Sequence, residues 1–322
     1  MIITRTPFRV SFIGGGSDLR EFYKYNNYGA VISTTIQKYM YIIIHPYFHD
    51  KIRLKYSITE DVKSIDDIKH PIIRECIKKV KINRGIEIAS FADIPSGTGL
   101  GSSSSFTVGL LHALYAHQGI MKTRVQLAKE ACEIEIDILK EPIGKQDQYA
   151  AATGGFNHIK FYPDEKVEIL PLNLSKRFVK KFESTLRLYY TGSNRSASIV
   201  LNEQKKNMSK KNKVNMMKQM VKLSEDFKKS LLDNNLDLAG DLLNENWRYK
   251  KHMADRITNT FIEDLYDKAI KLGAKGGKLL GAGGSGFLLI MANDHNSIEN
   301  NLGCRSIEIK IDSVGSTIIY KD

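Results

Sequence analysis

Hydrophobic and polar residues alternate with a period of two near the start of the chain. Phe8, Val10 and Phe12 alternate with Arg9 and Ser11. In a strand, this pattern places Arg9 on the face opposite the apolar side chains. The pattern predicts strands at residues 2–6 and 8–13, followed by a break at three consecutive glycines. Further strands are expected near residues 31–36, 39–47, 52–56 and 85–91.

Apolar residues recur with helical spacing in several later segments. They predict helices at residues 71–82, 103–118, 123–139 and 295–302, and a long helical stretch at 196–272 that breaks near residue 234 and at 255–260. Short strands are expected near residues 157–162, 166–170, 185–192, 306–311 and 316–320. Helices and strands are mixed without the regular alternation of a doubly wound sheet, which favours an α+β fold. We expect two units, residues 1–182 and 183–322.

A chain of 322 residues, 42% of them hydrophobic, can bury one large core or two ordinary ones. Its longest apolar runs are far shorter than a membrane span, and its first residues lack the apolar core of a secretory signal. Cys76, Cys132 and Cys304 are widely separated and form neither a disulfide framework nor a metal-binding pattern. These features favour a cytoplasmic protein with no membrane partner.

The formal net charge of +12 suits an anionic partner, such as a nucleotide, a phosphorylated metabolite or a nucleic acid. The densest group of lysines lies at residues 205–229, where we expect the solvated face of a helix. A surface that binds RNA would also need aromatic residues for base stacking, and this stretch contains only Phe227. We therefore expect no nucleic-acid partner, and a non-enzymatic RNA-binding protein is the remote alternative.

The sequence PSGTGLGSSSS, residues 95–105, places three glycines ahead of a serine run and an apolar helix. The first amides of a helix lack intrahelical partners and attract anions, and glycines let the backbone approach a ligand closely. The loop has neither the Gly-Lys-Ser/Thr ending of a Walker A motif nor the spacing of a dinucleotide fingerprint. A flexible linker is the alternative, but a linker would not lead directly into the apolar residues 106–116. We therefore predict an anion-binding loop.

Glu135 lies on the apolar face of the helix predicted at residues 123–139. That face is formed by Ala128, Ala131, Cys132 and Leu139. An unpaired carboxylate in such surroundings has a high free energy. A bound metal ion would remove this penalty, and so would a buried arginine or lysine; both interpretations stay open at this point.

Three motifs together resemble the GHMP kinases, the superfamily of galactokinase, homoserine kinase, mevalonate kinase and phosphomevalonate kinase. They are TPFRVSFIGGGSDL at residues 6–19, PSGTGLGSSSS at 95–105 and KLLGAGGSGFLL at 278–289. Their order and spread make the resemblance specific, whereas one motif alone would be weak evidence. The resemblance implies a two-domain fold, with an N-terminal domain of the ribosomal-protein-S5-like domain 2 type and a C-terminal ferredoxin-like domain. It also implies ATP-dependent phosphorylation of a small molecule.

The resemblance assigns residues to the phosphate donor and its metal. The loop that would bind ATP consists of Pro95, Ser96, Gly97, Thr98, Gly99, Leu100, Gly101, Ser102, Ser103 and Ser104. Ser103 and Glu135 would bind Mg²⁺, because Glu135 lies seven residues before Pro142, as the magnesium glutamate of the family does before its proline. Magnesium bound in this way would keep several waters and phosphate oxygens.

The resemblance also assigns the catalytic residues. Asp147, in EPIGKQDQYAAATGG at residues 141–155, matches the catalytic aspartate, and Arg9 matches the cation near the transferred phosphate. Asp147 would accept the proton of the acceptor hydroxyl or favour its loss. The alternatives are a cap for a helix that begins near residue 144 and, for Arg9, an ordinary surface arginine.

For the acceptor, the resemblance assigns hydroxyl binding to Asp18, whose alternative role is the N-cap of a helix at residues 19–26. Gly15 and Gly16 stand where galactokinases have an acidic residue and a histidine. This departure resembles the branch of heptose 7-phosphate kinases and related fucose-type kinases, so the expected partners are ATP and a sugar phosphate.

An acceptor that already carries a phosphate needs a basic residue at its far end. Arg195 is the first candidate, and Lys250 and Lys251 are further ones. Gly283 and Gly284 of the third motif complete the predicted substrate-binding set. Exposed strand edges would permit a homodimer.

Overall fold

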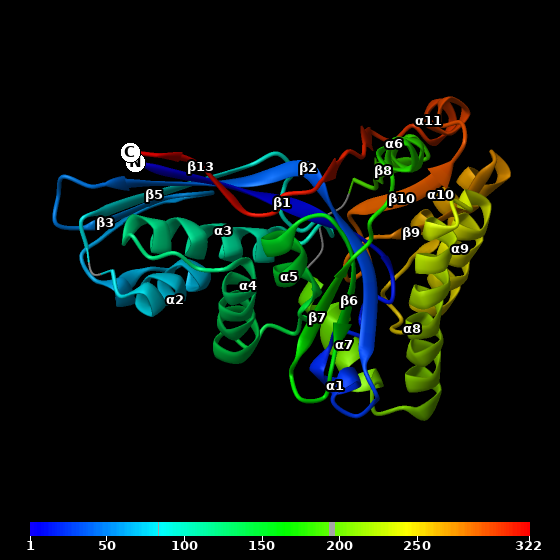
Figure 1. Cartoon of the computed structure of the whole chain (residues 1–322), viewed down its shortest axis with the longest axis horizontal. Helices are drawn as coiled ribbons and strands as arrows, with labels where there is room; N and C mark the ends of the chain where they lie inside the picture. Colours follow the sequence, from blue (N-terminus) through cyan, green and yellow to red (C-terminus); the bar gives the residue numbers. More distant parts are fainter. Residues whose placement is uncertain (83, 193–196) are drawn as a thin grey trace.

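The computed structural model describes residues 1–82, 84–192 and 197–322, and Figure 1 shows two β-sheets with helices packed against them. Among the described residues, the first sheet has nine strands, and six of them follow the order β13-β1-β2-β5-β3-β4. Strands β12 and β6 also pair with β2, and β7 pairs with β6. Its strands are β1 (Ile2–Ile13), β2 (Gly29–Pro46), β3 (Ile52–Lys55), β4 (Thr59–Val62), β5 (Ile86–Ala92), β6 (Phe156–Phe161), β7 (Val167–Pro171), β12 (Ile311–Asp312) and β13 (Thr317–Lys321).

Strands β1 and β2 are longer than the sequence pattern predicts. The expected break at residue 7 is a register shift between Pro7 and Phe8 within one strand, at a residue that has no backbone N–H to donate. The two strands expected near residues 31–36 and 39–47 likewise form the single strand β2. These two long antiparallel strands form the centre of the first sheet.

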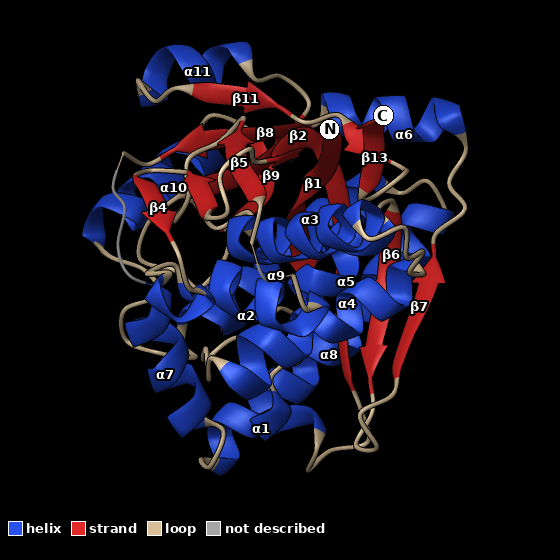
Figure 2. Ribbon diagram, turned by 90° about the vertical axis from the view of Figure 1, so that its left-hand side faces the viewer, coloured by secondary structure: helices blue, strands red, loops and turns tan. Residues whose placement is uncertain are grey.

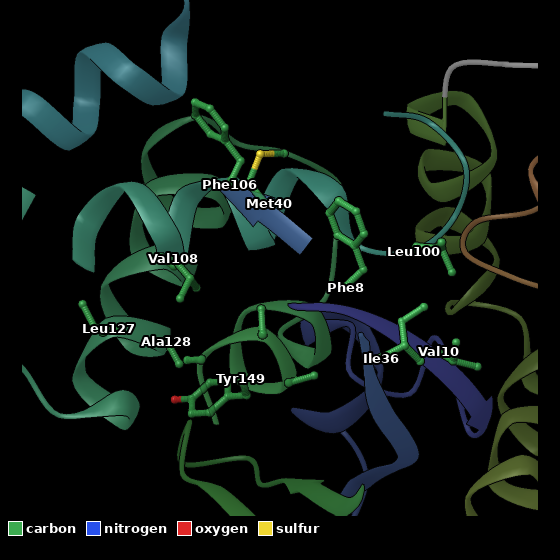
Figure 3. Packing of buried hydrophobic residues seen from close by; sticks show 14 of the residues in the cluster. Phe8, Val10, Ile36, Met40, Leu100, Phe106, Val108, Leu127, Ala128 and Tyr149 are labelled. Carbon is green, nitrogen blue, oxygen red and sulfur yellow. The ribbon is translucent and has the colours of Figure 1, made fainter. Parts of the chain in front are cut away.

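Helices cover one face of the first sheet (Figure 1). They are α2 (Pro71–Val80), α3 (Ser102–His117), α4 (Arg124–Cys132) and α5 (Gln146–Thr153). Helix α3 contacts both β1 and β2 and is buried on nearly all sides, as expected for a helix that is apolar all round. Figure 3 shows Phe106 and Val108 of α3 in one core with Phe8 of β1 and Ala128 of α4.

The second sheet is antiparallel and has the order β11-β8-β10-β9. Its strands are β8 (Leu186–Tyr190), β9 (Ala274–Leu279), β10 (Phe287–Ala292) and β11 (Ser306–Glu308). Helices α7 (Ala197–Asn207), α8 (Lys211–Leu232), α9 (Leu236–Lys251) and α10 (Thr260–Lys271) connect β8 to β9, and α11 (Asn296–Leu302) connects β10 to β11. Figure 2 shows α11 beside β11 at the top of the molecule. This connectivity confirms the expected ferredoxin-like arrangement and the α+β fold.

The C-terminal residues return to the first sheet. Strand β13 pairs with β1 and β12 pairs with β2, and the Met1 amino group lies 2.7 Å from the Asp322 carboxylate, so the two termini are adjacent (Figure 1). Residues 311–321 therefore pack with the N-terminal unit although they follow the second sheet. The boundary between residues 182 and 183 stays a proposal. A division at this point leaves residues 311–321 in the second unit by sequence, although they pair with strands of the first sheet.

The helix predicted at residues 123–139 changes its character halfway. Helix α4 begins with a capping box between Thr123 and Gln126 and continues as a π-helix, η2 (Glu133–Ile138). Such wider turns are rare and occur mostly near functional sites. Glu135 lies within this turn and is fully buried.

Three short helices complete the structure: α1 (Arg20–Tyr23), η1 (Ile65–Asp67) and α6 (Lys176–Ser184). The lysine-rich stretch at residues 205–229 is largely within α8, whose buried side is formed by residues such as Met217, Met220 and Phe227, so its lysines form the solvated face that the pattern predicts. No helix in the described ranges is both long enough and apolar enough to cross a bilayer.

Candidate active site

A cleft is lined by residues of both β-sheets and of the helices packed on them. It brings together predicted site residues from segments far apart in the sequence: Arg9, Gly15, Gly16, Asp18, Gly97, Gly99, Gly101, Ser102, Ser103, Ser104, Asp147 and Gly283. Helices α7 and α9 and the loop after β9 supply the other walls. The cleft therefore unites the three sequence motifs.

The glycine–serine loop presents the start of α3 to this cleft. Gly97, Gly99 and Gly101 have φ angles of +75°, +84° and +74°, a left-handed conformation that favours glycine. Gly101 is the N-cap residue of α3, and no side chain caps the helix there. Free helix amides at the cleft are the anion-binding feature that the sequence predicts.

The third motif packs directly on this loop. A Cβ on Gly99 would lie 2.5 Å from the carbonyl oxygen of Leu280, and the amide of Phe287 donates to the Thr98 carbonyl at 3.2 Å. Gly99 therefore has no room for a side chain. The contact between the two glycine-rich motifs fixes the shape of the loop.

Five of the predicted donor and substrate residues do not line the cleft: Pro95, Ser96, Thr98, Leu100 and Gly284. Thr98 donates its hydroxyl to the Pro95 carbonyl at 3.0 Å, and the Leu100 carbonyl accepts from the Arg9 amide at 3.0 Å. The amide of Gly284 donates a hydrogen bond to the Ile257 carbonyl oxygen at 2.8 Å, so Gly284 belongs to a turn. Ser96 is exposed beside Pro95. Arg195 lies outside the described residues.

Glu135 is buried against the serines that begin α3. Its carboxylate accepts hydrogen bonds from Ser103 Oγ at 2.6 Å, Ser104 Oγ at 2.9 Å and Gln148 Nε2 at 2.7 Å. Burial raises the pKa of Glu135 to about 7, although the three hydrogen bonds oppose the shift. Within the described residues no arginine or lysine forms an ion pair with it, so the alternative of a buried cationic partner is wrong there.

The donor set around Glu135 fits a magnesium ion. Ser103 Oγ and the carboxylate are hard oxygen ligands, and Ser103 lines the cleft. A cation beside a carboxylate with a raised pKa would restore the charged form. The described ranges contain no group of three or more His, Cys, Asp or Glu side chains that could hold a metal.

Arg9 and Asp147 form the ionic centre of the cleft. Arg9 Nε donates to Asp147 Oδ1 and Nη2 to Oδ2, both at 2.7 Å, while Nη1 donates to the Gly99 carbonyl at 2.6 Å. Arg9 is 5% exposed, so it is no ordinary surface arginine. Asp147 is in the first turn of α5, but Lys145 is the N-cap and no side chain caps the helix. The capping alternative for Asp147 is therefore wrong.

Asp18 does not cap the following helix either. The N-cap of α1 is Leu19, and Asp18 instead accepts from the amides of Gly16 at 2.9 Å and Gln146 at 3.1 Å. Burial and the nearby Asp147 raise the pKa of Asp18. These contacts anchor the carboxylate in the wall of the cleft, near the Arg9–Asp147 ion pair.

Sequence reasoning missed several cleft residues, among them Lys278 and Gln204, and gave Lys250 too little weight. Lys278 and Gln204 were not predicted, and Lys250 was only a further candidate, yet all three are buried and line the cleft. Lys278 could have been found, because it begins the third motif. Lys251 points elsewhere, since its Nζ donates to Glu263 at 2.7 Å.

The start of α3, the Ser103–Glu135 hydrogen bond and the Arg9–Asp147 ion pair are arranged around one cleft, as the chemistry of a phosphotransferase requires. Two family profiles match, "GHMP kinases N terminal domain" at residues 70–155 and "GHMP kinases C terminal" at residues 227–305. The chain belongs to the GHMP kinases.

Known relatives include kinases of sugars. The D-glycero-alpha-D-manno-heptose 7-phosphate kinase of Campylobacter jejuni is 29% identical over 305 residues, which cover 91% of this chain and 89% of that protein. The bifunctional fucokinase/GDP-fucose pyrophosphorylase of Arabidopsis thaliana is 25% identical over 320 residues, 89% of this chain and 29% of that protein. A solved structure of a D-glycero-D-manno-heptose 1-phosphate kinase from Bacteroides thetaiotaomicron has the same fold, with a TM-score of 0.81, 24% identity and 100% of both chains covered.

Proposed function

We propose that this protein transfers the γ-phosphoryl group of ATP, with Mg²⁺, to the anomeric hydroxyl of D-glycero-D-manno-heptose 7-phosphate. The observation that carries the proposal is the cleft that joins the Ser103–Glu135 pair to the Arg9–Asp147 pair. The first pair suits a metal-bound triphosphate, and the second suits the reacting hydroxyl and phosphoryl groups.

The reaction forms a bond between the anomeric oxygen and the γ-phosphorus and breaks the bond to the β–γ bridging oxygen, which releases ADP. Asp147 receives the hydroxyl proton at Oδ2, which among the described residues accepts only from Arg9 Nη2, whereas Oδ1 accepts from both Arg9 Nε and Gln146 Nε2. Arg9 balances negative charge on the phosphoryl group, and the amides that begin α3 orient the triphosphate. Ser103 and Glu135 would hold Mg²⁺, which would neutralise negative charge on the phosphates.

The relatives support a heptose phosphate as the acceptor without agreeing on the position of its phosphate. The Campylobacter relative is named for a heptose 7-phosphate and the Bacteroides structure for a heptose 1-phosphate. We choose the 7-phosphate because the Campylobacter relative matches this chain at 29% identity and the Bacteroides structure at 24%. In a heptose 7-phosphate, the anomeric oxygen also carries no phosphate and can react. A fucose-type acceptor is the second candidate, which the Arabidopsis relative supports.

A panel of acceptors tests the proposal. With Mg²⁺ and ATP, purified protein should release ADP faster with D-glycero-D-manno-heptose 7-phosphate than with fucose, galactose, N-acetylhexosamines, mevalonate or homoserine. The product should be the 1,7-bisphosphate, identified by ³¹P NMR. Turnover of free galactose or mevalonate at a tenfold higher rate would contradict the acceptor and leave the kinase class intact.

A further inference from the structure

Two buried lysines of the cleft have no role in the reaction as written. Lys250 of α9 is 3% exposed and Lys278 of β9 is 2% exposed, and both line the cleft. Lys250 Nζ donates one hydrogen bond, to the Gly15 carbonyl at 3.1 Å. In the described part of the chain, Lys278 Nζ has neither a hydrogen bond nor an ion pair. Buried ammonium groups without an anionic partner are destabilising.

In the described part of the chain, neither lysine forms an ion pair with a carboxylate of the cleft, although Asp18 is near enough to raise the pKa of Lys250. Asp147 is paired with Arg9 at 2.7 Å, and Asp18 accepts from two backbone amides. Glu141 also lines the cleft but is exposed to solvent. The positive charge of the two ammonium groups is therefore available to a ligand.

Gln204 of α7 adds an amide to the same wall. Its side chain is fully buried, and neither Nε2 nor Oε1 has a hydrogen-bond partner in the described ranges. A Cβ on Gly16 would lie 2.8 Å from Gln204 Nε2 and 3.3 Å from Lys250 Nζ. Gln204 Nε2 and Lys250 Nζ thus both approach Gly16 so closely that a side chain at this position would have no room.

We propose that Lys250, Lys278 and Gln204 form a subsite for a phosphate group that the acceptor already carries, so that the enzyme selects a sugar phosphate over the free sugar. The inference rests on the proposed kinase function and names the residues that set its acceptor class. Several N–H donors, two of them charged, suit a phosphate monoester. Because the triphosphate of the donor has its own loop and metal ligands, an anion bound here belongs to the second substrate.

Burial also supports the assignment. It lowers the pKa of Lys250 to about 8 and that of Lys278 well below its usual value. An anion between the two side chains would stabilise their protonated forms. Lys251 supplies the matched control, because it is adjacent in sequence but pairs with Glu263.

Steady-state kinetics with heptose 7-phosphate and the free heptose test the selectivity. Lys250→Met and Lys278→Met should each raise KM for heptose 7-phosphate by about 10-fold to 100-fold, the value of a lost charge-assisted hydrogen bond. KM for the free heptose and for ATP should change less than about threefold, and Lys251→Met should match the wild type. An equal loss with both sugars, or a raised KM for ATP alone, would overturn the subsite.

A binding measurement separates the subsite from the identity of the sugar. With Mg²⁺ and a non-hydrolysable ATP analogue filling the donor site, inorganic phosphate should raise the Tm of the wild type and of Lys251→Met, but not of Lys250→Met or Lys278→Met. This protection without heptose turnover would contradict the proposed acceptor and still support the subsite. Equal protection of all four proteins would overturn the subsite.

Stability without ligand provides a third readout. Removal of a buried, unneutralised ammonium group should leave Tm unchanged or raise it in Lys250→Met and Lys278→Met. A lower Tm in both variants would indicate that the lysines serve the fold, and it would overturn the inference.

Discussion

Arg9 and Asp147, 138 positions apart in the chain, form a bidentate ion pair. The pair lies against Gly101, where an added Cβ would come within 3.1 Å of Asp147 Oδ2 and 3.2 Å of Arg9 Cγ. A residue of the anion-binding loop is therefore in contact with both groups that would act on the phosphoryl group. Strand β1, helix α5 and the loop before α3 meet at this point, which explains why three distant segments are needed for one site.

Asp147→Asn should lower kcat by about 10²-fold or more, the scale of a lost acid–base group. The affinity for ATP, measured by calorimetry, should stay nearly unchanged. Asp137→Asn is the control, because Asp137 is an aspartate that pairs with Arg20 at the surface. A comparable loss of kcat in the control, or a large fall of Tm in Asp147→Asn alone, would assign Asp147 to the fold instead.

Glu135→Gln should raise the Mg²⁺ concentration for half-maximal activity by at least about 10-fold, because a neutral amide is a poor partner for the cation. It should also abolish most of the rise in Tm that Mg²⁺ and ATP give the wild type. Glu133→Gln is matched to it, since Glu133 lies in the same π-helix and pairs with Lys79 at 2.7 Å. An unchanged Mg²⁺ requirement in Glu135→Gln would remove Glu135 from the metal site.

Gly97→Ala and Gly99→Ala separate conformational strain from packing in the loop. Both glycines have left-handed backbones. An alanine in this conformation is strained, so either substitution should lower the free energy of unfolding by about 1 kcal/mol. Only Gly99→Ala meets the backbone of Leu280, since Gly97 has open space around its Cβ position. Chemical denaturation should therefore show an additional loss of about 1–3 kcal/mol for Gly99→Ala. Equal losses would mean that the two motifs do not pack as described.

The acceptor subsite should make kcat/KM depend on pH. Burial, opposed by Asp18 and assisted by Arg9, lowers the pKa of Lys250 to about 8, and Lys278 faces the same space. As the pH rises through 8, the ammonium loses its proton and kcat/KM for heptose 7-phosphate should fall. The second pKa of a phosphate monoester is about 6, so the substrate does not change charge in this range. The decline should be absent with free heptose; an identical decline with free heptose would contradict the role of Lys250.

Local sequence signals predict the parts of the site that depend on backbone conformation. The loop at residues 95–105 needs glycines and an uncapped helix start, and both are visible in the sequence. Strand alternation separates Arg9 from the apolar face, and helical spacing places Glu135 on an apolar one, whereas the role of Arg9 is implied by the family resemblance. These signals are short-range, so one sequence is enough to detect them.

Other features depend on contacts across the chain. The π-helix that carries Glu135 and the donation from Gln148 to its carboxylate arise only when α3, α4 and α5 pack together. Lys250 looks like any lysine near the end of a helix until α9 packs beside Gly15. The return of β13 to β1 is a pairing across almost the whole chain, and strand patterns do not specify such partners.

A crystal grown with Mn²⁺ in place of Mg²⁺ and a non-hydrolysable ATP analogue tests directly whether Ser103 and Glu135 bind the metal ion. An anomalous peak within coordination distance of Ser103 Oγ and the Glu135 carboxylate is expected, with the triphosphate over residues 97–104. A peak elsewhere, with Glu135 still bonded only to Ser103, Ser104 and Gln148 and the loop empty, would contradict a kinase site in this cleft.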